Sequence, residues 1–283
     1  MNDFSLGPAL LFCPADRPER YAKAAERADA VILDLEDAVA PGRKAAARDA
    51  LVDTPIDPGR VVVRVNAAGT EDFAADLEAL RRTEYSTVML PKASSAEQLA
   101  AVAGQGLHRV VALCETAEGV VHAAEIARAP NVVALMWGAE DLVASLGGSS
   151  SRRPDGTYRD VARHARSTVL LAAGAAGRPA VDTVHVDLAD SEGLREEALD
   201  AAAVGFAATA CLHPRQVETV RAAYRPGEEE LAAARALLEA ARGAAGVFAF
   251  RGRMVDEPLL RHAERLVRRA DDRIHPRPTR RRP

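Results

Sequence analysis

Two stretches of the chain decide its architecture: RVVALCETAEG at Arg109–Gly119 and NVVALMWGAEDL at Asn131–Leu142. Each is a short apolar run that ends in carboxylates, which are Glu115 in the first stretch and Glu140 with Asp141 in the second. Apolar runs of this length, bounded by polar residues, are typical of buried parallel strands. In folds built from such strands, ligands bind beyond the carboxyl ends, so the sequence predicts a functional site at these acids.

The chemistry of these acids leaves two interpretations open. Hard oxygen ligands on neighbouring strand ends suit Mg²⁺, which takes one or two protein carboxylates and leaves its other positions to water and substrate. Alternatively, the acids stabilise helix starts as N-caps or as first-turn residues that interact with the helix dipole. Because acids end two successive units, we favour a Mg²⁺ site, although spacing alone does not choose between Glu140 and Asp141.

The pattern of a short apolar run followed by an Ala-rich amphipathic stretch repeats along most of the chain. Eight such units in about 225 residues is the count for a (β/α)8 TIM barrel. A Rossmann-type sheet is the alternative, but that fold typically has a Gly-rich turn after its first strand. The corresponding segment here, CPADRPER, contains no glycine. We therefore expect an α/β fold with a catalytic barrel over residues 1–225. The predicted strands are Ala9–Cys13, Ala30–Leu35, Val61–Val65, Thr87–Leu90, Val110–Cys114, Val132–Met136, Thr183–Val186 and Ala207–Leu212.

The repeat ends at Arg225–Gly227, and a smaller appendage is predicted after it, over residues 226–270. Its pattern indicates a helix at Glu228–Arg242, a short strand at Gly246–Phe250 and a second helix at Glu257–Arg269. Residues 271–283 are basic and proline-rich with almost no apolar content, which predicts a disordered tail.

Composition narrows the class of protein. A hydrophobic content of 48 % provides for a large core, and a net charge of −4 argues against a nucleic-acid surface. The three cysteines cannot all pair and lie in or beside apolar runs, which is typical of buried thiols in a reducing cytoplasm. The chain has neither a signal-peptide pattern nor an apolar run of transmembrane length, so we expect a cytoplasmic protein without a membrane partner.

Further charged residues follow the other predicted strands. Alternation places Asp34 and Glu36 on one face in VILDLED, and Arg64 on one face with Val62 and Asn66 in VVVRVN; Lys92 lies just beyond the fourth strand. Arg64 is a candidate for bidentate binding of a substrate carboxylate, although a structural ion pair with Asp34 or Glu36 is the alternative.

The loops offer weaker candidates. Arg17 in the first turn can hold a phosphate or carboxylate, or can merely flank the helix that Pro18 opens. The small, basic loop Leu146–Arg153 can close over an anion, although an exposed linker is the simpler interpretation. For His213, at the end of the last strand, a structural role is favoured.

These residues resemble a known family. The citrate lyase beta-subunit-like enzymes of the HpcH/HpaI aldolase superfamily carry similar motifs in the same order, and the resemblance spans about residues 9–268. The segments FCPADRPER, WGAEDL and LGGSSSRR are most similar to free-standing actinobacterial members. The full set of motifs is LFCPADRPER, VILDLEDAV, VVVRVN, MLPKA, ETAEG, WGAEDL, CLHPRQ and GRMVDEPLL.

The resemblance implies a TIM barrel with a C-terminal lid, a homotrimer and a lyase that cleaves a 3-hydroxy acyl thioester with Mg²⁺ as cofactor. It implies that Glu115 and Asp141 ligate Mg²⁺, that Arg64 with Glu115 contacts the keto-acid portion, and that Glu140 has no ligand role. Other residues receive roles in the same way: Arg17, Lys92 and the Gly148–Ser151 loop lie near substrate, and Asp256 is a catalytic acid that a neighbouring subunit's lid delivers.

From these observations we expect a carbon–carbon lyase that converts a citramalyl-, malyl- or hydroxymethylglutaryl-CoA type of thioester to acetyl-CoA and a keto acid. Three alternatives remain open at this point: an acyl-CoA thioesterase, a malate-synthase-like condensing enzyme, and a non-catalytic or acyl-carrier-dependent subunit of a citrate lyase-type complex.

Overall fold

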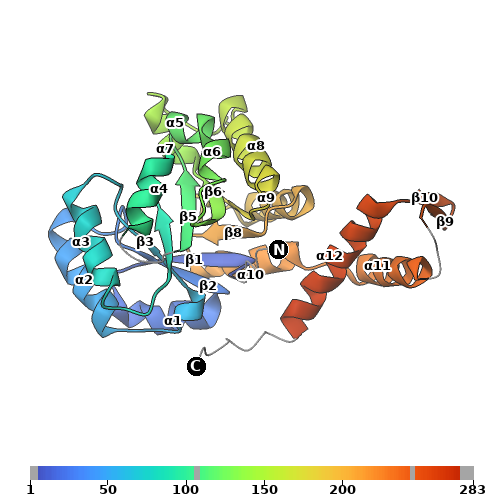
Figure 1. Ribbon diagram of the computed structural model, residues 1–283, viewed down its shortest axis with the longest axis horizontal. Coiled ribbons are helices and arrows are strands. Elements are labelled where there is room, and N and C mark those ends of the chain that lie inside the picture. The colour runs from blue at the N-terminus through green and yellow to red at the C-terminus, as the bar shows by residue number, and fades with distance from the viewer. Residues whose placement is uncertain (1–5, 105–108, 243–245, 275–283) are drawn as a thin grey trace. The chain divides into compact units, whose positions relative to one another are not determined.

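The computed structural model of the protein describes residues 6–104, 109–242 and 246–274. Its apolar runs form a closed parallel barrel in which each strand pairs with the next and β8 pairs back with β1 (Figure 1). The strands are buried on both faces, which explains their continuous Val, Leu and Ala runs. The predicted TIM barrel is confirmed. Its strands are β1 (Ala9–Pro14), β2 (Ala30–Asp34), β3 (Val61–Arg64), β4 (Thr87–Leu90), β5 (Arg109–Cys114), β6 (Val132–Trp137), β7 (Ala180–Asp182) and β8 (Ala208–Cys211).

Helices surround the barrel (Figure 1). Several begin at a side chain that caps the first turn: Thr70 accepts from the Phe73 amide at 3.1 Å, and Thr116 accepts from the Gly119 amide at 3.0 Å. The helices are η1 (Pro18–Arg20), α1 (Tyr21–Arg27), η2 (Pro41–Arg43), α2 (Lys44–Asp53), η3 (Pro58–Arg60), α3 (Glu71–Leu80), α4 (Ala96–Ala103), α5 (Ala117–Val121), α6 (Ala123–Ile126), α7 (Ala139–Ser145), α8 (Asp160–Ala175), α9 (Ser191–Val204) and α10 (Pro214–Tyr224).

Medium-sized side chains fill the barrel interior, because the chain has few aromatic residues. A fully packed barrel leaves no pore, so ligands must bind at the rim where the strands end. The interior cluster includes Leu10, Ile32, Val62, Met89, Val111, Leu113, Ala134, Met136, Val181 and Ala210.

The predicted position of the seventh strand is wrong. The structure has β7 at Ala180–Asp182, ahead of the predicted Thr183–Val186. The Asp182 carboxylate accepts a hydrogen bond from the Thr183 amide at 3.0 Å, which takes that amide out of the ladder. The alternating segment after it therefore forms a loop, although its pattern resembles that of a half-buried strand.

The chain divides into two compact units, Met1–Arg221 and Ala222–Pro283. The second contains α11 (Glu228–Ala241), β9 (Phe248–Phe250), β10 (Arg253–Val255) and α12 (Glu257–Ile274). Helices α11 and α12 pack through a small apolar cluster, and β9 and β10 form an antiparallel hairpin. The assignment of residues 226–270 as a lid remains a prediction. Helix α12 includes residues 271–274 of the predicted tail, and residues 275–283 lie outside the described residues.

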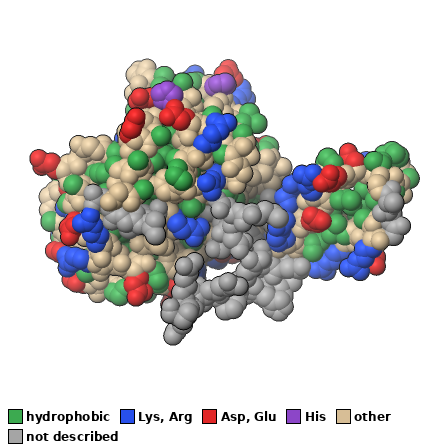
Figure 2. Space-filling model, in the orientation of Figure 1, with side chains coloured by type: hydrophobic (Ala, Val, Ile, Leu, Met, Phe, Trp, Pro, Cys, Tyr) green, Lys and Arg blue, Asp and Glu red, His purple; other side chains and the backbone are tan. Residues whose placement is uncertain are grey.

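The surface of the barrel unit carries charges of both signs. On the face drawn in Figure 2, acidic and basic side chains are interspersed. None of the helices in the described ranges is long and apolar enough to cross a bilayer.

A close approach of two backbones makes Gly119 a test of barrel packing. A Cβ at this position would lie 2.3 Å from the Ala93 carbonyl oxygen, which cannot move without shifting the chain after β4. We expect Gly119→Ala to lower the free energy of unfolding by about 1–3 kcal/mol. Gly174→Ala is the matched control, because nothing lies within 4 Å of a Cβ there. On helix α8 it should stabilise by roughly 0.5–1 kcal/mol. Thermal and denaturant unfolding measure both, and equal stability of the two variants would contradict the packing.

Candidate active site

The carboxyl ends of β2 to β6 bring charged side chains together at one rim of the barrel. Arg64 makes a two-pronged ion pair with Asp34, in which Nε lies 2.7 Å from Oδ1 and Nη2 lies 2.6 Å from Oδ2. Its Nη1 lies 3.1 Å from Glu36 Oε2, and the guanidinium stacks over Phe12 at 4.9 Å. Burial disfavours the positive charge, but the hydrogen bonds that Arg64 donates to Asp34 and the negative charge of Asp34 outweigh burial and raise the pKa of Arg64. The side chain is therefore a fixed, permanent cation.

The ion pair between Arg64 and Asp34 was one of the alternatives for these residues, and the structure contains it. The guanidinium has five N–H donors, and within the described residues its hydrogen bonds go only to Asp34, through Nε and Nη2, while Nη1 meets Glu36 Oε2 as an ion pair. The Asp34 oxygens also accept from the amides of Glu36 and Ala38 at 2.9 and 3.1 Å. Asp34 thus orients Arg64, whose remaining donors suit a carboxylate ligand.

Glu36 is buried beside this pair, with 6 % of its surface exposed. Its Oε1 accepts from Lys92 Nζ at 2.5 Å. Burial raises the pKa of Glu36, and the charges of Arg64 and Lys92 oppose that rise. The loop that carries it is held by Lys44, whose ammonium donates to the carbonyls of Leu35 and Glu36 at 3.0 and 3.1 Å.

Lys92 connects three acids from three strand ends. Its backbone is left-handed, with φ at 52°, a conformation that L-residues rarely adopt. In this conformation its amide donates to Glu115 Oε1 at 3.1 Å. Its ammonium donates to Glu36 Oε1 and lies 3.5 Å from Asp141 Oδ1. The backbone strain at Lys92 thus serves the geometry of the rim.

Glu115, which follows β5, has the most strongly shifted pKa among the carboxylates at this rim. It is 3 % exposed, and burial first, then the negative charges of Asp141 and Glu36, raise its pKa to about 8. Lys92 and Arg64 oppose this rise without cancelling it. A Cβ on Gly138 would lie 2.8 Å from both Cβ and Oε2 of Glu115, so glycine makes room for the carboxylate.

The two acids of the second stretch have different surroundings. Glu140 Oε1 accepts a hydrogen bond from Ser151 Oγ at 2.6 Å, which ties it to the loop after α7. Asp141 is half-buried in the first turn of α7 and faces Lys92 and Glu115. The geometry therefore favours Asp141 over Glu140 as a ligand.

The structure brings together four of the six predicted site residues: Arg64, Lys92, Glu115 and Asp141. Arg17 is exposed after β1, where its Nε lies 3.8 Å from Asp16. Asp256 lies in the second unit, and its Oδ1 accepts from the Leu259 amide at 3.3 Å. The roles of all six residues remain predictions.

Sequence reasoning missed Lys44 and Gly138. The glycine had a visible signal, since it directly precedes the acids of WGAEDL. Lys44 had none, because its partners are the carbonyls of Leu35 and Glu36 and the side chain of Asn66, a tertiary contact that no local pattern marks.

The residues at the rim fit a hard divalent cation. Within the described part of the chain, no three His, Cys, Asp or Glu side chains form a complete metal cage. Glu115 and Asp141 are two carboxylates on neighbouring strand ends, and after burial the negative charge of Asp141 is the next largest cause that raises the pKa of Glu115. Such a set suits Mg²⁺, which retains several positions for water and substrate.

Comparison with known proteins identifies the family of the chain. Residues 9–214 match the HpcH/HpaI aldolase/citrate lyase family model. The citrate lyase subunit beta-like protein of Mycobacterium tuberculosis is 63 % identical over 272 residues, covering 96 % of this chain and 98 % of the relative. A (3S)-malyl-CoA thioesterase of Cereibacter sphaeroides is 36 % identical, covering 93 % and 94 %.

A solved structure of CitE from Mycobacterium tuberculosis in complex with magnesium, acetoacetate and coenzyme A is 64 % identical. It superimposes with a TM-score of 0.88 over 94 % of this chain and 99 % of that one. The resemblance that the sequence motifs indicate, to free-standing actinobacterial members in particular, is confirmed. The chain belongs to the HpcH/HpaI aldolase/citrate lyase family.

Proposed function

We propose that the protein is a Mg²⁺-dependent lyase that cleaves a 3-hydroxy acyl-CoA to acetyl-CoA and a keto acid. The observation that carries this proposal is the buried Glu115 carboxylate next to Asp141 and the fixed Arg64 cation, all at the carboxyl rim of the barrel. The complex of CitE with magnesium, acetoacetate and coenzyme A supports the same ligand classes for this chain.

Glu115 and Asp141 would hold the metal, and Lys92 would stay beside them as a donor to the substrate. When bound, Mg²⁺ supplies Lewis-acid stabilisation of negative charge on substrate oxygen. Arg64 binds the carboxylate of the keto-acid portion and stabilises charge at the same end. Because Asp34 already fixes the guanidinium, no reorganisation is needed when charge develops.

The proposed reaction is a retro-Claisen-type cleavage. The substrate hydroxyl gives its proton to a general base and becomes the carbonyl of the keto acid as the C–C bond breaks, and the electron pair of that bond moves into the thioester enolate. An acid then protonates the enolate carbon to give acetyl-CoA. We assign this acid to Asp256 of a neighbouring copy in a homotrimer, and in the condensation direction it would be the base. The buried thiols fit a reducing cytoplasm, where we place the enzyme.

A second candidate is a thioesterase or a malate-synthase-like condensing enzyme. The similarity to a (3S)-malyl-CoA thioesterase favours this alternative. The same charged residues at the barrel rim could serve enolate formation and thioester hydrolysis. Product analysis separates the candidates. The purified protein is incubated with Mg²⁺ and citramalyl-, malyl-, citryl- or 3-hydroxy-3-methylglutaryl-CoA, and acetyl-CoA, keto acid and free CoA are measured. Acetyl-CoA with keto acid marks a lyase, and free CoA marks hydrolysis or synthase turnover.

The alternative of a non-catalytic or acyl-carrier-dependent subunit is tested by the same incubation. Turnover of CoA thioesters by the purified chain alone excludes this alternative. Turnover that appears only with thioesters of an acyl-carrier protein would support it.

Removal of either proposed metal ligand should abolish Mg²⁺-dependent keto-acid binding. We expect Glu115→Ala and Asp141→Ala to bind pyruvate or oxaloacetate no better with Mg²⁺ than without it, as measured by calorimetry, while both proteins stay folded. Glu140→Gln is the matched control, because glutamine keeps an oxygen that accepts from Ser151. Unchanged binding in both alanine variants would refute the metal site, and equal loss in Glu140→Gln would make Glu140 the ligand.

Arg64→Lys keeps a positive charge but loses the planar fork that binds both Asp34 and a carboxylate. We expect turnover to fall on the order of 10²-fold. Arg128→Lys, at an exposed position on the barrel, is the control. Near-normal steady-state kinetics of Arg64→Lys would show that the residue is only a structural ion-pair partner.

Asp256→Asn should stop cleavage without affecting the metal site. An asparagine side chain can still accept the hydrogen bond from the Leu259 amide, so α12 keeps this contact. Asparagine cannot, however, transfer a proton to the enolate. We expect normal Mg²⁺ and keto-acid binding with a loss of turnover of roughly 10²–10⁴-fold. Glu257→Gln, the exposed neighbour, is the control.

Mixing Asp256→Asn with Glu115→Ala after dissociation and reassembly tests whether the site is shared between copies. Assemblies that contain both variants should regain activity, because one copy supplies the metal ligands and another the acid. Mixed assemblies, verified by mass spectrometry, that remain inactive would refute the shared site.

A further inference from the structure

The segment after α7 is anchored to a distant helix by one arginine. Arg152 binds Glu197 on α9 through both terminal nitrogens, and its Nη2 lies 3.1 Å from Glu197 Oε2. Its guanidinium also donates to the Tyr158 hydroxyl at 2.7 Å and stacks over the Tyr158 ring at 3.9 Å. Although it lies in a surface loop, the Arg152 side chain is only 17 % exposed.

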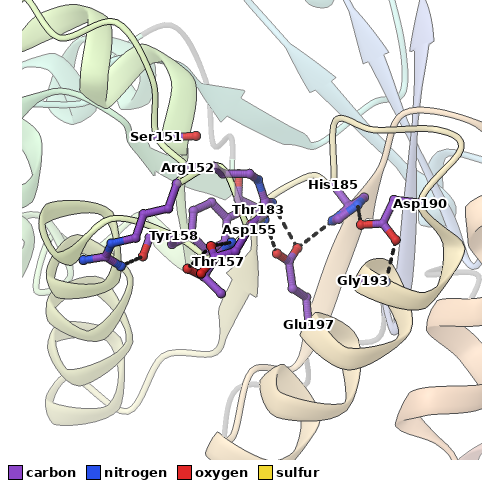
Figure 3. Close-up of polar contacts among 12 residues, drawn as sticks. Ser151, Arg152, Asp155, Thr157, Tyr158, Thr183, His185, Asp190, Gly193 and Glu197 are labelled. Atoms are coloured by element: carbon purple, nitrogen blue, oxygen red, sulfur yellow. Dashed lines mark hydrogen bonds and ion pairs between the residues drawn. The ribbon is translucent and has the colours of Figure 1, made fainter.

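Glu197 holds a second loop as well. Its Oε2 lies 2.8 Å from Nδ1 of His185, which is in the loop after β7 and is 4 % exposed. Nε2 of the same imidazole lies 3.3 Å from Asp190 Oδ2 at the start of α9. Figure 3 shows Glu197 on α9 between the segment of Tyr158 on one side and His185 with Asp190 on the other. One carboxylate therefore joins the segment after α7 to the loop after β7.

The anchored segment leads directly to the rim. Ser151, next to Arg152 in the chain, is 2 % exposed and donates to Glu140 at 2.6 Å. Glu140 precedes Asp141 in the first turn of α7. Contacts and adjacent residues thus form an unbroken path from Glu197 to the carboxylate that we assign to the metal.

We propose that Glu197 is a positioning residue: it fixes the loop after α7 through Arg152, and this loop, through Ser151 and Glu140, holds the first turn of α7 so that Asp141 faces Glu115. The inference rests on the proposed function only for the role of Asp141. Among the described residues, the polar contacts of Glu197 are with Arg152 and His185, neither of which is a proposed metal ligand or substrate contact.

The charge of Glu197 matters for this role. Burial disfavours its ionisation, but the hydrogen bonds from His185 and Arg152 outweigh burial and lower its pKa. Replacing Glu197 by glutamine keeps the shape, removes the charge and leaves Arg152 without its carboxylate partner in a largely buried place. A buried arginine without a carboxylate partner is more stable in water, so the Arg152 side chain should turn out to solvent and release the loop after α7.

Glu197→Gln is tested against Glu196→Gln, since Glu196 is exposed on the same helix turn. The first measurement is the rate at which trypsin cuts the Arg152–Arg153 bond in the folded protein, followed by mass spectrometry. Trypsin binds the Arg152 side chain in its own specificity pocket, so Arg152 must first leave Glu197. The cleavage rate therefore reports how often the contact between Arg152 and Glu197 opens. We expect Glu197→Gln to be cut about tenfold faster than wild type and Glu196→Gln at the wild-type rate.

The second measurement is calorimetric titration of Mg²⁺ in the presence of pyruvate. We expect the dissociation constant of Glu197→Gln to rise by about tenfold, the low end of what residues that support metal ligands contribute. Its thermal midpoint should fall by less than about 4 °C, which separates positioning from a general loss of stability. Arg152→Lys keeps the trypsin site and a charge but loses the fork, so it should shift both readouts in the same direction.

The double variant Glu197→Gln/Arg152→Lys should be no worse than the more affected single variant, because both changes break one contact. Two results would overturn the inference. One is a double variant whose losses are the sum of those of the two single variants; the other is a Glu197→Gln variant whose cleavage rate and Mg²⁺ affinity both stay within twofold of wild type. If wild-type protein binds no Mg²⁺, the proposed function fails, whereas the cleavage rates still decide whether Glu197 anchors the loop.

Discussion

Two carboxylates, Glu36 and Glu115, are held almost completely out of water at the rim of the barrel, and the surrounding site depends on this burial. Removing an ionised carboxylate from water costs several kcal/mol unless opposite charges and hydrogen bonds compensate for it. Arg64 and Lys92 compensate for this cost only in part, because the pKa of Glu36 and the pKa of Glu115 both stay raised. The barrel core supplies the stability that offsets this cost, and the neighbouring Glu115 and Asp141 carboxyl groups are what a divalent cation would bind.

Local backbone features make the burial possible. The left-handed conformation of Lys92 turns its amide toward Glu115, and the absence of a side chain at Gly138 leaves room for the Glu115 carboxylate. Lys44 satisfies carbonyls in the loop that carries Glu36. The rim is therefore defined as much by residues that contact the backbone as by the charged side chains themselves, which is the general condition for a preorganised site.

The sequence predicts the barrel well, because buried parallel strands require continuous apolar runs and β5 and β6 have them. It predicts that Glu115 and Asp141 meet, because the strand ends of a barrel converge. It fails at β7, where the hydrogen bond from the Thr183 amide to Asp182 ends the strand early. It also cannot reveal the pair of Arg152 and Glu197, which lie 45 residues apart, or distinguish Asp256 from an ordinary exposed acid. The pair of Arg152 and Glu197 depends on a tertiary contact, and the role that we propose for Asp256 involves a neighbouring copy; local patterns encode neither.

Metal-directed cleavage tests the central claim most directly. Fe²⁺ is substituted for Mg²⁺ in the presence of pyruvate, and ascorbate with hydrogen peroxide then generates radicals that cut the backbone next to the bound ion. Mass spectrometry of the fragments locates the metal without any assay of activity. The account predicts cuts close to residues 115 and 138–141, which excess Mg²⁺ suppresses. Cuts confined to other segments, or a pattern that Mg²⁺ does not change, would contradict it.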